Sequence, residues 1–436
     1  MDGNYPFAEK GHASFRDVLK NRNFVKLWVS QIGSQISYRM VTLALIISVF
    51  QTTKSNISVV FLIFAFAIPA LIFGLPAGAY VDRHSRKRIL IITNFLQAIT
   101  ILALLLTKDV VWLVLFVIFV YSAINQLYIP SETSTIPNLV EDRNLLAANS
   151  LFMFTVYGSY IIGYGLAGPM MYLFGNDSPF ILGGALLLIA AFSCVLLPSD
   201  KHHFKNIKMS KIYKNVWYEL KEAYEFIISK KNVLSAVIKL TLIQALLGIL
   251  VVLIPSFSQN ILKIDIRTAS VIFITPVVLG TVVGALMVSK MSKRIKISRL
   301  VKGSIIADGL IIILVGALYP IGKFIKTEFG LPFLNNHALL IVFGVLVTFL
   351  GIVNSLIVIS SQTELQRETP NKIRGRVFGV FGMFVSVAAL LPMLFLGALA
   401  DFISVTNVFI LAGILVTIYG IFSSSNKILD IIKNNH

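Results

Sequence analysis

The stretch Phe24–Phe50 decides the fold of this chain, and it reads FVKLWVSQIGSQISYRMVTLALIISVF. It is long enough to cross a bilayer, because a membrane-spanning helix needs about 20 mostly apolar residues. Arg39 is its only charged residue after Lys26. An ionised side chain at the centre of a span is costly unless it faces water or a partner, and arginine keeps its proton in proteins. We therefore expect Arg39 to face a water-filled or ligand-filled cavity inside a bundle of membrane helices.

Polar residues recur along one face of this predicted helix at helical spacing. They are Gln31, Gln35, Tyr38, Arg39 and Thr42. A polar stripe on a membrane helix favours a path for a solute. The alternative interpretation is structural, with Arg39 bound to backbone carbonyls or to a buried acid.

The composition is that of a polytopic membrane protein, with 56% hydrophobic and 13% charged residues among 436 and a mean hydropathy of +0.84. Charged and Pro/Gly-rich breaks divide the chain into twelve apolar segments, namely 24–50, 57–80, 89–107, 110–129, 147–173, 178–197, 232–255, 268–289, 299–319, 337–360, 375–400 and 404–423. Lipid offers the backbone no hydrogen-bond partners, and these runs are too long for barrel strands. The predicted fold class is therefore all-α, with twelve transmembrane helices.

The net charge of +18 follows the predicted topology. Most Lys and Arg residues lie in the tails and in alternate loops, namely 1–26, 81–88, 141–143, 198–231, 290–302, 366–376 and 424–436. Basic residues concentrate on the cytoplasmic side of membrane proteins. We expect a multi-pass protein of the cell (inner or cytoplasmic) membrane with both termini cytoplasmic. The charge then attracts anionic lipid, and no nucleic-acid partner is expected.

The longest polar interruption separates six spans from six. The predicted organisation is a cytoplasmic N-terminal segment 1–23, a six-helix half 24–197, a cytoplasmic linker 198–231, a second six-helix half 232–423 and a tail 424–436. Apolar residues from Ile212 to Ile227 recur at helical spacing, which predicts an amphipathic helix in the linker. That helix lies either on the inner membrane surface or against the underside of the bundle.

The two halves repeat each other in sequence. Ser131-Glu132-Thr133 after the fourth span matches Ser361-Gln362-Thr363 after the tenth, and Gly78 before a basic loop matches Gly284. Two pseudosymmetric six-helix halves are a common architecture of secondary transporters, with the solute site near the midplane between them.

The loop after the second span reads GAYVDRHSRKR over residues 78–88. It resembles the G-x-x-x-D-R-x-x-R-K signature of the major facilitator superfamily. The resemblance implies a cytoplasmic gate, a latch between the halves that favours the outward-open state, made by Gly78, Asp82, Arg83, Arg86, Lys87 and Glu132. In this gate Gly78 allows two helices to approach closely, and Asp82 lies near the helix N-terminus after Arg376. Glu132 is expected near Arg86.

Further segments resemble the drug-exporter branch of the superfamily, which includes bacterial macrolide efflux proteins and the enterobactin exporter. These segments are Asn21–Phe24, Ile136–Val140, Leu145–Ser150 and Arg374–Phe378. Gly168-Pro169 resembles the end of the antiporter motif G-x-x-x-G-P, with Tyr164 in place of the first Gly. Such exporters often carry an acid in the first span, where this chain has Tyr38 and Arg39. The resemblance implies a secondary active transporter that exports an amphipathic drug, such as a macrolide, or a siderophore by alternating access and proton antiport.

Candidate substrate residues lie on polar faces of central spans. They are Gln31, Gln35, Tyr38, Arg39, Tyr121, Asn125, Tyr128, Tyr157, Gln244 and Asn354, with Tyr160 and Tyr164 on the face of Tyr157. Tyrosine rings stack on apolar or cationic ligands, although helix packing explains each of them equally well. Proton coupling requires an acid in or at the edge of the membrane, and the candidates are Glu132, Asp308 and Glu364. Alternatively, Asp308 pairs with a neighbouring helix and Glu364 pairs with Lys290 or Arg294.

Enzyme classes find no support in the sequence. It has no nucleotide-binding Gly-Lys-Ser/Thr loop, and its six histidines lie in tails or loops. We expect no cofactor and no metal.

The expected partners are a small-molecule substrate, a coupling ion (H⁺) and the lipid bilayer, and we expect a monomer. Two alternatives stay open: uptake or flipping of a lipid or anionic metabolite and, in another class, a non-transporting membrane receptor or intramembrane enzyme. The cationic centre favours substrates that carry an anion or many hydroxyls.

Overall fold

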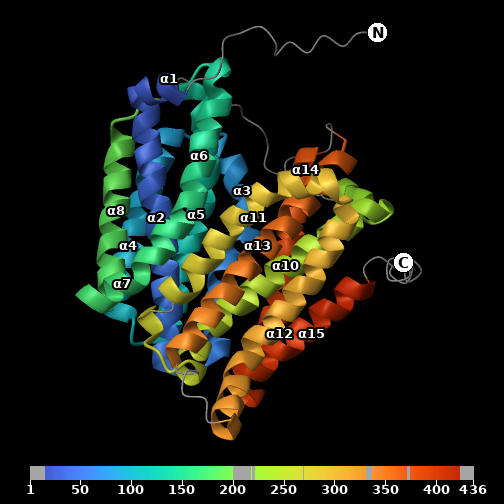
Figure 1. Cartoon of the computed structure of the whole chain (residues 1–436). Helices are drawn as coiled ribbons and strands as arrows, with labels where there is room; N and C mark the ends of the chain where they lie inside the picture. Colours follow the sequence, from blue (N-terminus) through green and yellow to red (C-terminus); the bar gives the residue numbers. More distant parts are fainter. Residues whose placement is uncertain are drawn as a thin grey trace, which may run out of the picture. The chain divides into compact units, whose positions relative to one another are not determined.

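The computed structural model describes residues 15–199, 218, 221–268, 270–329, 336–370 and 374–422. Within these ranges every secondary-structure element is a helix (Figure 1). Eleven described helical stretches are long and apolar enough to cross a membrane, and α14 (Arg374–Ile403) adds a shorter apolar stretch, Ala388–Ile403. Each of the twelve apolar segments of the sequence corresponds to one of these stretches. The predicted all-α, polytopic fold is confirmed.

The described helices group into two compact units. Unit 1 draws its described residues from Met1–Leu45 and Ala65–Lys208, and unit 2 from Ile46–Phe64 and Met209–His436. The boundaries fall inside α2 (Arg22–Thr53) and α3 (Asn56–Val81). The end of α2 and the start of α3 therefore belong to unit 2.

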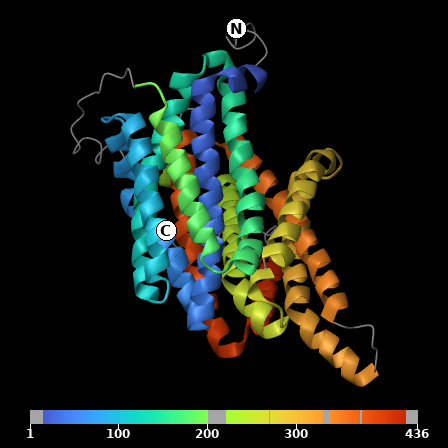
Figure 2. The same cartoon turned by 90° about the vertical axis from the view of Figure 1, so that its left-hand side faces the viewer.

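Unit 1 contains the described helices of the first half of the chain. Besides parts of α2 and α3 these are α1 (Phe15–Lys20), α4 (Arg86–Thr107), α5 (Val111–Leu139), η1 (Asp142–Asn144), α6 (Leu145–Ser159), the π-helical η2 (Tyr160–Tyr164), α7 (Gly165–Phe174) and α8 (Ser178–Val195). α4 packs against both α5 and α8. Figure 2 shows α2 between α8 and the continuous helix α6–η2–α7, and Gly33 and Gly163 mark its contacts with these two neighbours.

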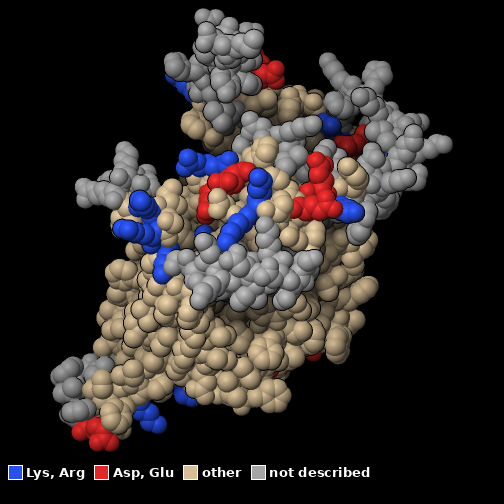
Figure 3. Space-filling view, turned by 90° about the vertical axis from the view of Figure 1, so that its right-hand side faces the viewer, with Lys and Arg blue, Asp and Glu red and all other residues tan. Residues whose placement is uncertain are grey.

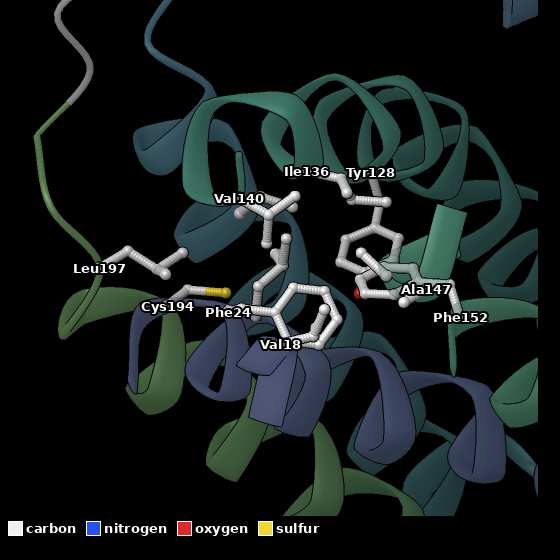
Figure 4. Close-up of a cluster of buried hydrophobic side chains, with 12 residues drawn as sticks. Val18, Phe24, Tyr128, Ile136, Val140, Ala147, Phe152, Cys194 and Leu197 are labelled. Atoms are coloured by element: carbon white, nitrogen blue, oxygen red, sulfur yellow. The ribbon is translucent and has the colours of Figure 1, made fainter. Parts of the chain in front are cut away.

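An apolar cluster lies near the ends of α2, α5 and α8 in unit 1 (Figure 4). The rings of Phe24 and Phe152 lie 5.7 Å apart, centroid to centroid, and tie α2 to α6. Tyr128 from α5 and Cys194 from α8 are buried in the same cluster. The Cys194 thiol donates a hydrogen bond of 3.2 Å to Ser30 Oγ, so this cysteine is a packing residue.

Unit 2 contains the remaining described helices. They are α10 (Lys231–Ser256), η3 (Phe257–Ile261), η4 (Ile266–Thr268), η5 (Ser270–Ile274), α11 (Thr275–Arg294), α12 (Ile297–Phe329), α13 (Asn336–Glu368), α14 and α15 (Val405–Phe422). α11 packs against α13, α12 against α13 and α15, and α10 against α13 and α14. A stack of aromatic rings around Phe257, with Phe273, Phe343 and Phe409, joins η3 to η5, α13 and α15.

The end of the predicted amphipathic linker helix docks on unit 2. Residues 221–229 are helical, and Ala223 and Ile227 are buried in a cluster with residues of α10, α13 and α14. Of the two placements that the sequence left open, these residues adopt the one against the bundle. The first part of the predicted helix, residues 212–217, and residues 219 and 220 lie outside the described residues.

The outward surface is that of a protein surrounded by lipid. On the face in Figure 3, most of the visible charged side chains lie in the upper part, and uncharged surface covers most of the part below them. Large apolar side chains are exposed on the described helices, such as Leu106 at 89% and Trp112 at 75%. A soluble monomer rarely exposes so much contiguous apolar surface, so the chain is a multi-pass membrane protein.

Asp401, at the end of α14, binds the N-terminus of α3 within unit 2. Its Oδ1 accepts hydrogen bonds from the backbone N–H and the side-chain amide of Asn56, at 2.9 and 2.6 Å. Its Oδ2 accepts from the Ser55 hydroxyl at 2.7 Å and from the Ile57 N–H at 3.3 Å. The first N–H groups of a helix have no partner within the helix, and a carboxylate there also interacts favourably with the helix dipole. Asp401 therefore caps α3.

We expect Asp401→Ala to destabilise the protein by about 1 kcal/mol, the usual cost of losing an N-terminal cap. The midpoint of thermal unfolding in detergent should fall by about 1–4 °C. Asp109→Ala removes an exposed acid from a loop and should leave the midpoint unchanged. Equal midpoints for the two variants would mean that the cap does not form in the folded protein.

Candidate functional site

The candidate site is built around Arg39 of α2, within unit 1. The guanidinium Cζ lies 3.9 Å from the ring centroid of Tyr160 and 4.9 Å from that of Tyr38. Arg39 also donates a hydrogen bond to the Tyr164 side chain. The negative face of an aromatic ring attracts a cation, and the attraction grows when the cation is desolvated. Three tyrosines therefore hold this charge in the middle of a span.

Arg39 has no acid partner in the described part of the chain. None of the ion pairs Lys108–Asp177, Arg143–Glu141, Lys221–Glu225 and Lys239–Glu364 involves Arg39. The Arg39 Nε is buried and has no hydrogen-bond acceptor. The described residues thus do not show the buried acid of the structural alternative. The site keeps an unneutralised positive charge and a free donor.

A π-helical turn presents two of these tyrosines to Arg39. η2 spans Tyr160–Tyr164, and the rings of those two residues lie 5.8 Å apart, centroid to centroid. Single π turns inside α-helices are frequent at functional sites. Between them along the chain lies Gly163, where an added Cβ would be 2.5 Å from Arg39 Cβ and 3.0 Å from the carbonyl oxygen of Ile36. Only glycine allows the turn to approach α2 this closely.

We expect Gly163→Ala to separate η2 from α2 and to weaken the site. Forcing a methyl group into a packed contact costs about 1–3 kcal/mol, so both thermal stability and solute binding should fall. Gly158→Ala is the matched control, because it lies on the preceding α6 and an added Cβ there meets nothing within 4 Å. Thermal unfolding and binding measured on both variants test the contact. A Gly163→Ala protein as stable and as active as the Gly158→Ala protein would contradict it.

An aromatic wall continues the site towards α3 and α5. The Tyr38 ring stacks on that of Tyr121 at 6.2 Å and meets that of Phe66 edge-on at 5.6 Å, centroid to centroid. One turn further along α5, the Asn125 Oδ1 accepts a hydrogen bond of 3.1 Å from Gln97 Nε2. The structure thus brings the predicted residues Tyr38, Arg39 and Tyr121 together.

Other candidates on α2, α5 and α6 lie elsewhere in unit 1. Tyr128 is buried, donates a hydrogen bond of 2.6 Å to Glu132 and accepts one of 3.0 Å from Ser34. Gln31 is buried and its Nε2 donates to the Phe152 carbonyl at 3.4 Å. Tyr157 is 68% exposed. Gln35 is half-buried on α2.

The two candidates from the second half belong to unit 2. Gln244 is exposed on α10. Asn354 is buried on α13 and donates a hydrogen bond of 3.0 Å to Asp308 Oδ1. Asp308 is fully buried on α12, and its Oδ2 has no partner among the described residues. Asp308 thus pairs with a neighbouring helix, as its structural alternative requires.

The remaining coupling candidate, Glu364, has a partner that the sequence did not suggest. Its carboxylate lies 3.3 Å from Lys239 Nζ, and the Lys239 side chain is only 12% exposed. The side chains of Lys290 and Arg294, the predicted partners, lie outside the described part of the structure.

The basic loop between α3 and α4 contacts backbone carbonyls of unit 1. Arg86 donates a hydrogen bond of 2.7 Å to the Ser134 carbonyl near the end of α5, and Lys87 donates to the Leu197 carbonyl. The described residues contain no ion pair between Arg86 and Glu132, since the Glu132 carboxylate binds Tyr128. Asp82 is exposed, and Arg83 Nη2 is buried without an acceptor.

The close helix approach expected at Gly78 stays a prediction within the described part of unit 1. A Cβ at Gly78 would meet no described atom within 4 Å, whereas one at Gly284 would lie 2.5 Å from the Ile352 carbonyl oxygen. Within unit 2 a close approach is found at the repeated position, where α11 crosses α13. The Arg376 side chain, expected near Asp82, lies outside the described residues.

The described ranges contain no cluster of His, Cys, Asp or Glu that could hold a metal ion.

Comparisons with known proteins place this architecture in a family. The family model of the Major Facilitator Superfamily matches residues 27–329. The chain is similar to the uncharacterised transporter YfiS of Bacillus subtilis (strain 168), at 23% identity over 416 residues, 93% of each chain. It is also similar to macrolide efflux protein A of Streptococcus pyogenes, at 23% identity over 402 residues, 90% of this chain and 93% of that one.

Among solved structures, the nucleoside transporter NupG has a similar fold. Its TM-score is 0.68 at 16% identity, with 92% of this chain and 99% of that chain covered. The resemblance that the loop at residues 78–88 indicated is therefore confirmed at the level of the family. The chain belongs to the Major Facilitator Superfamily, and it is a transporter rather than an enzyme.

Proposed function

We propose that this protein exports an amphipathic small molecule by alternating access and that the solute binds beside Arg39. The observation that carries the proposal is an unneutralised arginine in mid-span, held by Tyr38, Tyr160 and Tyr164, with its Nε left free. A charge in this position is costly to keep. A site that uses the charge to bind a polar group of the solute offsets that cost.

The direction of transport is proposed from similarity. Macrolide efflux protein A is similar to this chain along most of its length, and segments of the sequence resemble drug exporters. We propose that the protein acts as a monomer in the cell membrane, with both termini cytoplasmic, as the distribution of Lys and Arg predicts. The basic loop with Gly78, Asp82, Arg83, Arg86 and Lys87 then lies on the cytoplasmic side and serves as the gate.

Proton coupling is proposed to use Glu132. Its carboxylate is buried and accepts the Tyr128 hydroxyl, which itself accepts a hydrogen bond from Ser34 on α2. This chain of hydrogen bonds ends on the helix that carries Arg39. A proton on Glu132 therefore has a path by which it can influence the solute site. Glu364 already pairs with Lys239 and Asp308 with Asn354, so both are expected to be structural.

Two assays in proteoliposomes test this proposal. The first measures solute accumulation with and without a proton gradient, and the second measures counterflow after the vesicles are preloaded with solute. The wild-type protein should accumulate solute against its gradient only when the proton gradient is present. Glu132→Gln should abolish this uphill accumulation and leave solute counterflow within about threefold of wild type, because exchange needs no proton cycling. Asp308→Asn and Glu364→Gln are the controls and should still pump uphill. Uphill pumping by all three variants would exclude these acids, and flux that ignores the gradient would contradict proton antiport itself.

A further inference from the structure

We infer that the Arg39 site selects amphipathic solutes by an oxyanion, such as a carboxylate, sulfonate or phosphate, attached to a flat apolar body. The inference rests on the proposed function, since it names the class of solute for the same site. It also predicts that the site rejects the corresponding cations.

The first observation is the charge of the site, which no described carboxylate neutralises. The groups that the structure places around the Arg39 guanidinium are the Tyr160 and Tyr38 rings and the Tyr164 hydroxyl, and none is a carboxylate. Ring faces attract a cation but do not cancel its charge. A second cation entering the site would be repelled, whereas an anion would neutralise Arg39 without leaving an unpaired charge.

The second observation concerns the hydrogen-bond donors of Arg39. Arginine presents its N–H groups as a planar fork that matches two oxygens of one oxyanion, and such charge-assisted pairs are stronger than neutral hydrogen bonds. The buried Nε has no acceptor in the described structure. Because this atom is closed off in the present conformation, a ligand oxygen reaches it only after the side chain shifts. The nitrogen of a cationic ligand could not accept from it at all, because it has no lone pair to offer.

The third observation concerns the aromatic rings that lie beside Arg39. Tyr38 and Tyr121 stack nearly parallel, at an angle of 15°, and Phe66 meets Tyr38 edge-on. Tyr121 is buried, whereas Tyr38 and Phe66 keep part of their surface exposed. A flat apolar body can pack on such rings at little entropic cost, because they are already held in place. The oxyanion and the flat body would therefore be bound by adjacent parts of one site.

Two fluorescent probes that differ by one group test this inference. 8-Anilinonaphthalene-1-sulfonate carries a sulfonate, and N-phenyl-1-naphthylamine is the same ring system without it. Saturable binding is measured on the full-length protein in nanodiscs of zwitterionic lipid, with empty nanodiscs subtracted. The wild-type protein should bind the sulfonate at least tenfold more tightly than the neutral probe. Arg39→Gln should bring the ratio close to one, and Arg39→Lys should keep part of it.

Arg143→Gln is the matched control, because it removes an equal charge from an exposed residue outside the site and should keep the full ratio. A wild-type ratio near one, no saturable sulfonate binding, or an unchanged ratio in a folded Arg39→Gln protein would each overturn the inference. If Arg39→Gln does not fold, the wild-type ratio decides alone, and the cationic dye ethidium must fail to compete with the sulfonate.

The lipid composition of the nanodiscs distinguishes two natural sources of the oxyanion, a lipid headgroup and a free solute. If a lipid headgroup is the natural ligand, nanodiscs with phosphatidylglycerol should weaken sulfonate binding to the wild type and not to Arg39→Gln. If a free solute is the natural ligand, the lipid should have no effect beyond that seen with Arg143→Gln. Both results support an oxyanion site. Sulfonate selectivity without any transport would contradict the proposed function alone, and export of neutral or cationic solutes without selectivity would contradict this inference alone.

Discussion

Arg39→Ala is expected to lower solute transport by about 10- to 100-fold, which corresponds to the loss of one hydrogen bond to a charged group. The same substitution should leave the folded yield and the thermal unfolding midpoint within experimental error of wild type, or raise the midpoint slightly. The reason is that Arg39 has no carboxylate partner among the described residues. Removing it therefore strands no opposite charge, and the relief of an uncompensated charge offsets the lost contacts with Tyr38, Tyr160 and Tyr164.

Transport and thermal unfolding measured on the same preparations separate this role from a structural one. A structural arginine would show the opposite pattern, with lower stability and with transport reduced only in proportion to the folded fraction. Arg39→Lys refines the result, since lysine keeps the charge but loses the planar fork. It should recover part of the transport activity.

Gly351→Ala is expected to have the largest effect on stability. Gly351 of α13 faces α11, and an added Cβ would overlap the Val277 carbonyl oxygen and lie 2.9 Å from the Thr281 amide nitrogen. Gly280 of α11 meets the Thr348 carbonyl in the same way. These neighbours are backbone atoms that cannot turn aside, so the two helices must separate. We expect a cost above about 3 kcal/mol and a clear loss of monodisperse protein.

Gly344→Ala is the matched control on the same helix. It lies two turns before Gly351, and an added Cβ there meets nothing within 4 Å. Alanine is the better helix former by about 1 kcal/mol, so this variant should be as stable as wild type or more stable. Size-exclusion profiles and unfolding midpoints of the pair test the crossing. Equal stability of the two variants would show that α11 and α13 do not touch so closely.

The sequence predicted the spans because hydropathy alone decides whether a segment can remain in lipid. It also indicated Arg39 as a candidate, since a fixed charge in mid-span needs a reason. It did not predict which tyrosines hold Arg39. Tyr157, Tyr160 and Tyr164 share a predicted face, but a π turn, which periodicity does not reveal, brings only the last two to Arg39.

A shared helix face also gave too large a set of candidates on α5. Tyr121 and Tyr128 lie on one face, yet at 1.5 Å per residue they are about 10 Å apart along the axis. Tyr121 reaches Tyr38, whereas Tyr128 is buried in the apolar cluster near the ends of α2, α5 and α8 (Figure 4). Periodicity indicates the direction of a side chain, and the level of its partners along the bundle depends on tertiary packing.

Two departures from the exporter pattern in the sequence are partners in the structure. Tyr164 replaces a glycine of the antiporter motif, and Arg39 lies where such exporters often have an acid in the first span. Arg39 donates a hydrogen bond to Tyr164. Each residue alone weakens the resemblance, but both belong to the candidate site. The sequence contains no information on contacts between the first and fifth spans, so it does not link these two residues.

The most direct test of the account is protection of a thiol by the transported solute. The chain has one cysteine, the buried Cys194, so Cys194→Ser provides a background without thiols. Tyr160→Cys then places a thiol at the Arg39 site, and Tyr172→Cys places one at an exposed position on α7. A solute that the protein transports should slow labelling by a membrane-permeant maleimide at position 160 and not at position 172. Unchanged labelling at position 160, with a solute that is still transported, would contradict the claim that the solute binds beside Arg39.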